Sequence, residues 1–252
     1  MRLLQSLKHT ITRVLLLCVV APLSRMSRRQ VVHFLHVGKT GGTAVKAAFS
    51  AYPFFVRFHR GAVLLFHNHS VGLTHVRDSD RFVAFFRDPA TRFVSGFNSR
   101  LRKGRPRRFV PWSRGERRAF ARFPSAESLA AGLSHPDERT RRAAQQAMNS
   151  IEHVRSFQSE WVRGCAGLSR RQAGVLLLGR QETLTRDFER LRELLELGPD
   201  VRLPESPRAA HRSPADAGGE LSAEARENLR RWYEEDYKLL SCIARHGYEE
   251  QR

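Results

Sequence analysis

One stretch of the sequence restricts the fold more than any other: an apolar run, a glycine-bearing turn and a helical segment follow one another directly. Val31–Val37 is β-branched and apolar, which predicts a buried strand. Thr43–Ala51 contains good helix formers and an apolar face, so it predicts a helix. Further short apolar runs alternate with helical segments along the chain. This alternation predicts an α/β fold of three layers, α/β/α, with a central parallel sheet.

The other elements are predicted from the same two patterns. Further strands are expected at Val63–Phe66, Arg81–Phe86 and Val175–Leu178, and helices at Thr91–Arg100, Ser125–Leu133, Asp137–Val162, Leu184–Leu197 and from Leu221-Ser222 through Ala244. The Asp137–Val162 pattern is interrupted near Asn149-Ser150, and Leu101–Gly115 and Val201–Gly219 are expected to be loops. Ligands of parallel sheets bind at the carboxyl ends of the strands, so the residues that follow each strand are the candidates for a site.

The turn after the first strand reads His36-Val37-Gly38-Lys39-Thr40-Gly41-Gly42-Thr43. Glycines allow backbone N–H groups to converge on a phosphate at the N-terminus of the next helix. Lys39 adds a positive charge, and Thr40 and Thr43 add hydroxyl donors. The turn is not a Walker A loop, because Lys39 precedes the glycine pair instead of following the second glycine of G-x-x-x-x-G-K-[ST]. A nucleotide-dependent kinase or P-loop hydrolase is therefore the weaker enzymatic alternative.

A second anion-binding pair follows the Arg81–Phe86 run. Arg87 ends this strand, and Ser95 lies eight residues later in a helical segment. An arginine at a strand end and a serine two turns into the next helix can face one phosphate. Arginine also binds phosphate oxygens in bidentate fashion.

These two segments resemble the donor-binding motifs of the carbohydrate sulfotransferase families. HVGKTGGT resembles the 5′-phosphosulfate motif H-[IV]-P-K-[TS]-G-[GS]-[TS], with Gly38 where the family usually has proline. FVAFFRDPATRFVSGF resembles the 3′-phosphate motif R-[DN]-P-x-x-R-x-x-S, and fainter similarity extends over residues 31–242. The resemblance implies a P-loop-like nucleotide-binding sulfotransferase fold over residues 30–252. It also implies transfer of a sulfuryl group from 3′-phosphoadenosine-5′-phosphosulfate (PAPS) to an acceptor hydroxyl, on a carbohydrate or a glycolipid.

The resemblance assigns a role to each donor-site residue. Lys39 contacts the 5′-phosphate and stabilises the bridging oxygen as it leaves, and Arg87 with Ser95 binds the 3′-phosphate. Arg92 is a weaker third member that orients Asp88. No metal is expected, because lysine and backbone N–H groups neutralise the leaving group. The residues expected to bind PAPS, and its product adenosine 3′,5′-bisphosphate, are Gly38, Lys39, Thr40, Gly41, Gly42, Thr43, Arg87 and Ser95, with His211-Arg212-Ser213 in a loop over the nucleotide.

Two histidines follow the Val63–Phe66 run and are candidates for the base that takes the proton of the acceptor hydroxyl. FHNHS resembles the F/Y-H-G-H segment of the heparan sulfate 2-O-sulfotransferase group. The resemblance implies that His67 and His69 serve the acceptor, with His69 slightly ahead. Alternative bases are Glu152, His153 and Glu160, whereas His33 is expected to be structural and His36 to support the loop.

The formal net charge of +19 attracts anionic partners such as nucleic acid, acidic membranes or acidic polysaccharides. A basic nucleic-acid-binding protein is therefore the non-enzymatic alternative, although no helix-turn-helix, zinc-finger or RNP-type signature supports it. We expect the basic Arg100–Arg118 region to bind an anionic or sugar-rich acceptor, and nucleic acid is not expected as a partner.

The cysteines and the N-terminal segment indicate the cellular compartment and possible contact with a membrane. Cys18, Cys165 and Cys242 are odd in number and far apart, so no disulfide framework is expected and a reducing, cytoplasmic compartment is the easier fit. Residues 1–29 predict an N-terminal amphipathic helix, packed on the domain or on a membrane surface. A degenerate anchor or signal is the second interpretation, because the apolar run Val14–Leu23 is short for a membrane span.

Overall fold

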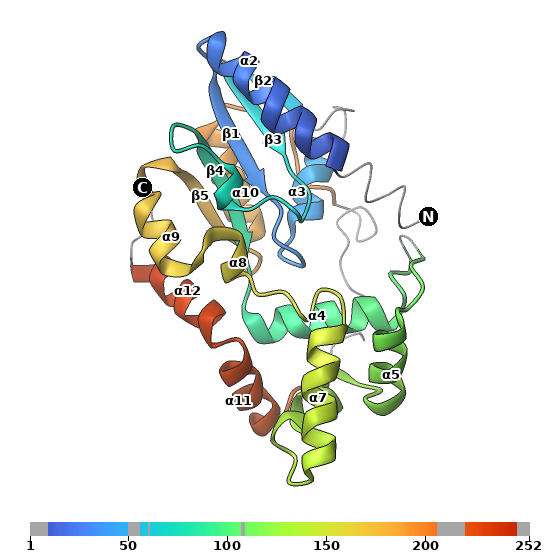
Figure 1. The fold of residues 1–252 in the computed structure, drawn as a ribbon. Helices are drawn as coiled ribbons and strands as arrows, with labels where there is room; N and C mark the ends of the chain where they lie inside the picture. The colour runs from blue at the N-terminus through green and yellow to red at the C-terminus, as the bar shows by residue number, and fades with distance from the viewer. Residues whose placement is uncertain (1–9, 50–55, 60, 107–108, 206–219, 246–252) are drawn as a thin grey trace.

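The computed structural model describes residues 10–49, 56–59, 61–106, 109–205 and 220–245. A five-stranded sheet with the order β2-β3-β1-β4-β5 forms the centre (Figure 1). Four neighbouring strands are parallel, and β2 pairs with β3 in the antiparallel direction at one edge. The strands are β1 (Gln30–Leu35), β2 (Val56–His59), β3 (Ala62–Phe66), β4 (Arg81–Phe86) and β5 (Val175–Arg180).

The sheet has a topological switch point between β1 and β4. The chain runs from β1 to β3 on one side of β1, and then returns to place β4 on the other side. At such a point the connections after the two strands diverge, which leaves a crevice at their carboxyl ends where ligands bind. The glycine-bearing turn follows β1 and Arg87 follows β4, so both segments predicted to bind the donor lie at this point of the sheet.

Helices cover both faces of the sheet, which confirms the predicted three-layer α/β/α architecture. On one face, α3 (Gly42–Ala48) and α10 (Leu184–Leu194) pack on β1 and β4 through residues that include Val45, Phe34 and Phe188. The other face is covered by α8 (Ser159–Val162), α9 (Gly164–Arg170) and α12 (Glu234–Arg245), and by a helix over residues 10–26.

The remaining helices form a lobe beyond the carboxyl edge of the sheet (Figure 1). Their shared core contains Phe93, Phe97, Phe120, Met148 and Tyr233. The helices of the lobe are α4 (Pro89–Leu101), α5 (Arg114–Arg122), α6 (Ala126–Ala131), α7 (Glu138–Ser150) and α11 (Ala223–Trp232). The short elements of the fold are η1 (Leu15–Val20), α2 (Ala21–Met26), η2 (Leu73–His75), η3 (Gly132–Ser134) and η4 (Gln172–Gly174).

Several elements differ from the sequence-based expectation. The edge strand β2 was not predicted, and α5 begins at Arg114, inside the region expected to be a loop. The predicted C-terminal helix is two helices, because it breaks between α11 and α12 at Tyr233. Over the described residues, the longest apolar helical stretch is too short to cross a membrane.

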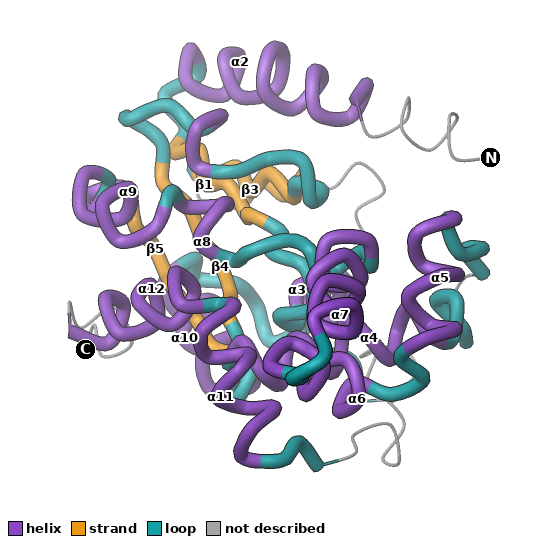
Figure 2. Tube along the Cα trace, turned by 60° about the horizontal axis from the view of Figure 1, so that its bottom comes forward, coloured by secondary structure: helices purple, strands orange, loops and turns teal. Residues whose placement is uncertain are grey.

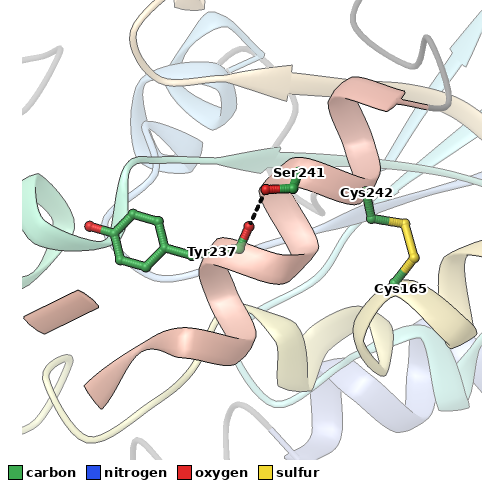
Figure 3. The surroundings of a disulfide bond; sticks show 4 residues. All are labelled: Cys165, Tyr237, Ser241 and Cys242. Carbon is green, nitrogen blue, oxygen red and sulfur yellow. Dashed lines mark hydrogen bonds between the residues drawn. A yellow bond between two sulfur atoms is a disulfide. The ribbon is translucent and has the colours of Figure 1, made fainter. Parts of the chain in front are cut away.

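The expectation that the cysteines form no disulfide was wrong. Cys165 of α9 and Cys242 of α12 form a disulfide with a Cα–Cα distance of 5.8 Å (Figure 3). The two residues are 77 positions apart, so spacing in the sequence does not reveal that packing of α9 against α12 brings them together. Cys18 is a free cysteine and is exposed.

Candidate functional site

The turn between β1 and α3 has a tightly determined backbone. Gly41 has φ 88° and Lys39 has φ 69°, in the left-handed region where glycine is tolerated best. A Cβ atom on Gly42 would lie 2.4 Å from Cδ2 of His36, so glycine is required for the turn to close against that ring. The Thr40 hydroxyl donates to the carbonyl of Val37 at 3.0 Å. His36 therefore packs on the turn, as its expected supporting role requires.

Two arginines from the segment after β4 reach this turn. Arg92, which is 1% exposed, donates from Nε to the carbonyl of Gly38 at 2.9 Å and from Nη1 to the carbonyl of Ser156 at 2.8 Å. Arg87 Nη1 lies 3.5 Å from the carbonyl of Lys39. Arg92 thus holds the turn itself. Asp88, which we expected it to orient, instead caps α4 by accepting from the backbone N–H of Thr91.

Several positive charges surround the turn. Burial, followed by the nearby positive charges of Arg87, Arg102 and Arg92, lowers the pKa of Lys39 to about 8. The charged neighbours with the largest effect on this pKa are therefore cations. Arg102, which follows α4, was not among the predicted site residues, because nothing in its local sequence separates it from the other arginines of this region. A bound anion would offset the repulsion among these groups.

Hydrogen bonds from Gln158, which Asp236 of α12 holds in turn, fix the backbone of Arg87 at the end of β4. Gln158 accepts from the backbone N–H of Arg87 at 2.9 Å and donates to its carbonyl at 2.8 Å. Asp236 in turn accepts from the backbone N–H of Gln158 at 2.9 Å. The Arg87 side chain donates from Nε to the Thr91 hydroxyl at 3.1 Å. Thr91 and Ser95 are four residues apart in α4 and share one helix face, so Arg87 lies on the face that carries Ser95.

The two histidines after β3 have different surroundings. His67 is 1% exposed, and its Nε2 lies 2.8 Å from Nδ1 of His33, whose Nε2 lies 3.0 Å from a carboxylate oxygen of Asp80. Burial, followed by the neighbouring His33 and Lys46, lowers the pKa of His67 well below its usual value. His33 is thus part of a buried chain, as expected of a structural residue.

His69 is exposed and faces an open cavity. Its Nδ1 lies 2.9 Å from the carbonyl oxygen of His36. A carbonyl oxygen only accepts hydrogen bonds, so Nδ1 carries the proton and the lone pair of the neutral ring is on Nε2. The structure therefore separates the predicted histidine pair: His69 lines the cavity, and His67 is not among its lining residues.

The cavity, of about 380 Å³, lies beside the turn and brings together residues from four parts of the chain. It contains all three residues that sequence reasoning left as alternative bases. Burial, followed by the charge of Lys39, lowers the pKa of His153 to about 3, so this ring is neutral near pH 7. Burial raises the pKa of Glu160. The residues that line the cavity include Gly38, His69, Arg92, Glu152, His153, Glu160 and Trp161.

The arginine-rich segment differs from the role proposed for it. Arg100 is 2% exposed and donates to both carboxylate oxygens of Glu116, at 2.6 and 2.9 Å. Such a buried bidentate pair connects α4 to α5, so Arg100 is not available to an acceptor. Arg114, Arg117 and Arg118 of the same segment are exposed on α5. The predicted loop His211-Arg212-Ser213 lies outside the described residues.

Within the described ranges, no group of three His, Cys, Asp or Glu side chains is arranged to hold a metal ion. A comparison with family models matches the sulfotransferase family over residues 23–241, which covers well over half of the chain. No curated protein and no solved structure matches. The family prediction from the two donor motifs is therefore confirmed.

Proposed function

The chain belongs to the sulfotransferase family, and we propose that it takes the sulfuryl group from PAPS and transfers it to a hydroxyl of a carbohydrate or glycolipid acceptor. The observation that carries the proposal is the cluster of Lys39, Arg87, Arg92 and Arg102 around a glycine-bearing turn at the switch point of the sheet. The charged neighbours with the largest effect on the pKa of Lys39 are three arginines, so a ligand with several negative charges complements the site.

The donor residues fit PAPS in two places. The turn from Gly38 to Thr43 offers the N-terminus of α3 and the ammonium of Lys39 to the 5′-phosphosulfate end. Arg87 precedes α4 and bonds to Thr91 on the helix face that carries Ser95, which supports a shared role of Arg87 and Ser95 at the 3′-phosphate. When bound, PAPS supplies the sulfuryl group and a phosphate leaving group. Lys39 counters the negative charge that grows at this end of the site, which is where a preformed positive charge lowers a barrier.

His69 is the residue we propose as the base for the acceptor hydroxyl. It lines the cavity next to Gly38, and the bond of Nδ1 to the His36 carbonyl keeps the lone pair on Nε2. His67, the other predicted base, is buried in the chain with His33 and Asp80 and is proposed to position the segment that carries His69. Glu152, His153 and Glu160 line the same cavity and stay as alternatives.

The decisive experiment is transfer of ³⁵S from labelled PAPS to a panel of glycans, glycolipids and small alcohols. We expect label in at least one hydroxyl acceptor, no transfer by Lys39→Ala, and unchanged transfer by Arg122→Ala, an exposed arginine on α5. A second measurement compares the affinities for adenosine 3′,5′-bisphosphate and adenosine 5′-phosphate. Arg87→Ala should abolish the preference for the bisphosphate. If it keeps that preference, or if the chain hydrolyses ATP with Mg²⁺ and ignores PAPS, the proposal is wrong.

A further inference from the structure

One side of the helix over residues 10–26 packs against the sheet. Leu16 and Ala21 are buried against Val31 of β1 and Val63 of β3. Near the C-terminal end of the helix, Arg25 donates from Nε to a carboxylate oxygen of Asp80 at 2.8 Å. The helix is therefore held lengthwise on the sheet, and in Figure 2 it is the outermost layer on its side of the molecule.

The opposite side of this helix is also apolar. Successive members of the exposed set are one to four residues apart, which places them in one broad stripe along the helix. Among the described residues, the only other large apolar side chains with comparable exposure are Phe109 and Leu194, which are isolated. An apolar patch concentrated in this way marks an interaction surface. The stripe consists of Ile11, Val14, Leu15, Val19, Leu23 and Met26, which are 43% to 80% exposed, together with the exposed Cys18.

We infer that this stripe is a docking surface for an anionic lipid bilayer, with the helix in the plane of the interface. An amphipathic helix binds an interface by inserting its apolar side at the level of the headgroups, while nearby cations attract acidic lipids. Arg13 lies at the start of the stripe and the exposed Arg28 follows its end, in a chain with a net charge of +19. The sheet holds the other side of the helix, so the stripe is the part presented to the bilayer.

Charge favours a bilayer over a second copy of the chain as the partner. In an antiparallel pairing of two such helices, Arg13 of one copy meets Arg28 of the other, and in a parallel pairing each meets its own equivalent. Both pairings place cations together. Acidic headgroups complement the same arginines, and the apolar side chains between them match the upper acyl region.

Cys18 provides a probe within the stripe itself. It is the free cysteine of the described chain, whereas Cys165 and Cys242 are bonded to each other. The full chain, labelled at Cys18 with an environment-sensitive fluorophore, is mixed with vesicles of phosphatidylcholine alone or with added phosphatidylglycerol. With the anionic vesicles we expect a blue shift of the fluorophore emission and co-sedimentation of the protein. Binding to the neutral vesicles should be weaker, and high salt should remove this difference between the two kinds of vesicle.

Substitutions test whether the stripe makes the contact. Val14→Glu combined with Leu23→Glu should weaken vesicle binding at least tenfold, on the order expected when charges replace two inserted apolar side chains. Leu194→Glu, a matched change at an exposed leucine of α10, should bind as the original chain does, and circular dichroism checks that each variant folds. If the labelled native chain shows no blue shift on anionic vesicles, or the double variant binds equally well, the inference fails. It also fails if light scattering shows a dimer that the double variant dissociates.

Discussion

The lowered pKa of Lys39 makes the affinity of the donor site depend on pH, and this dependence is the most direct test of the proposed site. Without ligand, burial and three arginines hold the pKa of Lys39 at about 8, against an ordinary value of 10.5. A phosphate group beside the ammonium favours the charged form, so we expect a bound phosphate to return the pKa to its ordinary range. Binding then takes up a proton at any pH between the two values.

The size of the effect follows from this linkage. At pH 7 the amine is already charged in the free protein, so little affinity is lost. At pH 9.5 most free molecules have a neutral Lys39, and binding must first restore its proton. With a pKa of about 8 in the free protein and about 10.5 in the complex, the affinity falls about 30-fold between pH 7 and 9.5. The shifted histidines titrate below this window and the shifted tyrosines above it, while the arginines remain charged.

Isothermal titration calorimetry with adenosine 3′,5′-bisphosphate measures this profile, and buffers of different ionisation enthalpy report the proton uptake. The control is Lys39→Arg, whose guanidinium stays charged over the whole range and should give a flat profile. An affinity of the original chain that is constant from pH 7 to 9.5, or an equal fall in Lys39→Arg, would refute the reasoning that places the phosphate beside this ammonium.

Three further predictions concern stability and the acceptor. Glu116→Gln should cost about 3–5 kcal/mol in urea unfolding, because it breaks the buried pair with Arg100. Although burial alone would raise the pKa of Glu116, its bonds to Arg100 and Ser113 lower the pKa to about 2, so the original chain should lose this stability as pH falls from about 4.5 towards 2, and the variant should not. Reduction of Cys165–Cys242 should lower the unfolding free energy by about 4.5 kcal/mol for a loop closed over 77 positions, and alkylation should rise from one to three thiols per chain. His69→Ala should lower kcat of sulfuryl transfer about 10²-fold or more with an unchanged Kd for the bisphosphate, whereas an equal loss in both would indicate a structural role.

Much of the fold could be predicted because its signals are local. The predicted strand Arg81–Phe86 coincides with β4, and the helices predicted from Ser125 and from Leu221-Ser222 begin at α6 and α11, which Ser125 and Ser222 cap. An apolar run or a capping serine acts on residues next to it in the chain, so the sequence displays both partners of the interaction. The unpredicted α5 begins with its own capping box, Ser113 and Glu116, a local signal hidden by the density of arginines around it.

The segments of the proposed donor site could be recognised for the same reason. The turn from Gly38 to Thr43 is a continuous segment whose glycines permit its backbone conformation, and Arg87 lies between β4 and α4, the helix that carries Ser95. The location of both segments at one crevice required only the rule that parallel strands present their carboxyl ends to the same edge. The contribution of Arg102 to the field was not visible, because it depends on how α4 ends in space relative to the turn.

The sequence by itself determined the class of fold, the family and the segments of the proposed donor site, since each of these depends on residues that are close along the chain. Only the tertiary structure decided which histidine reaches the cavity: His67 bonds to His33, and His69 bonds to the carbonyl of His36. It also decided that Cys165 meets Cys242 and that Glu160 joins the cavity. These outcomes depend on partners distant in sequence, whose approach is set by the packing of helices on the sheet and not by any local pattern.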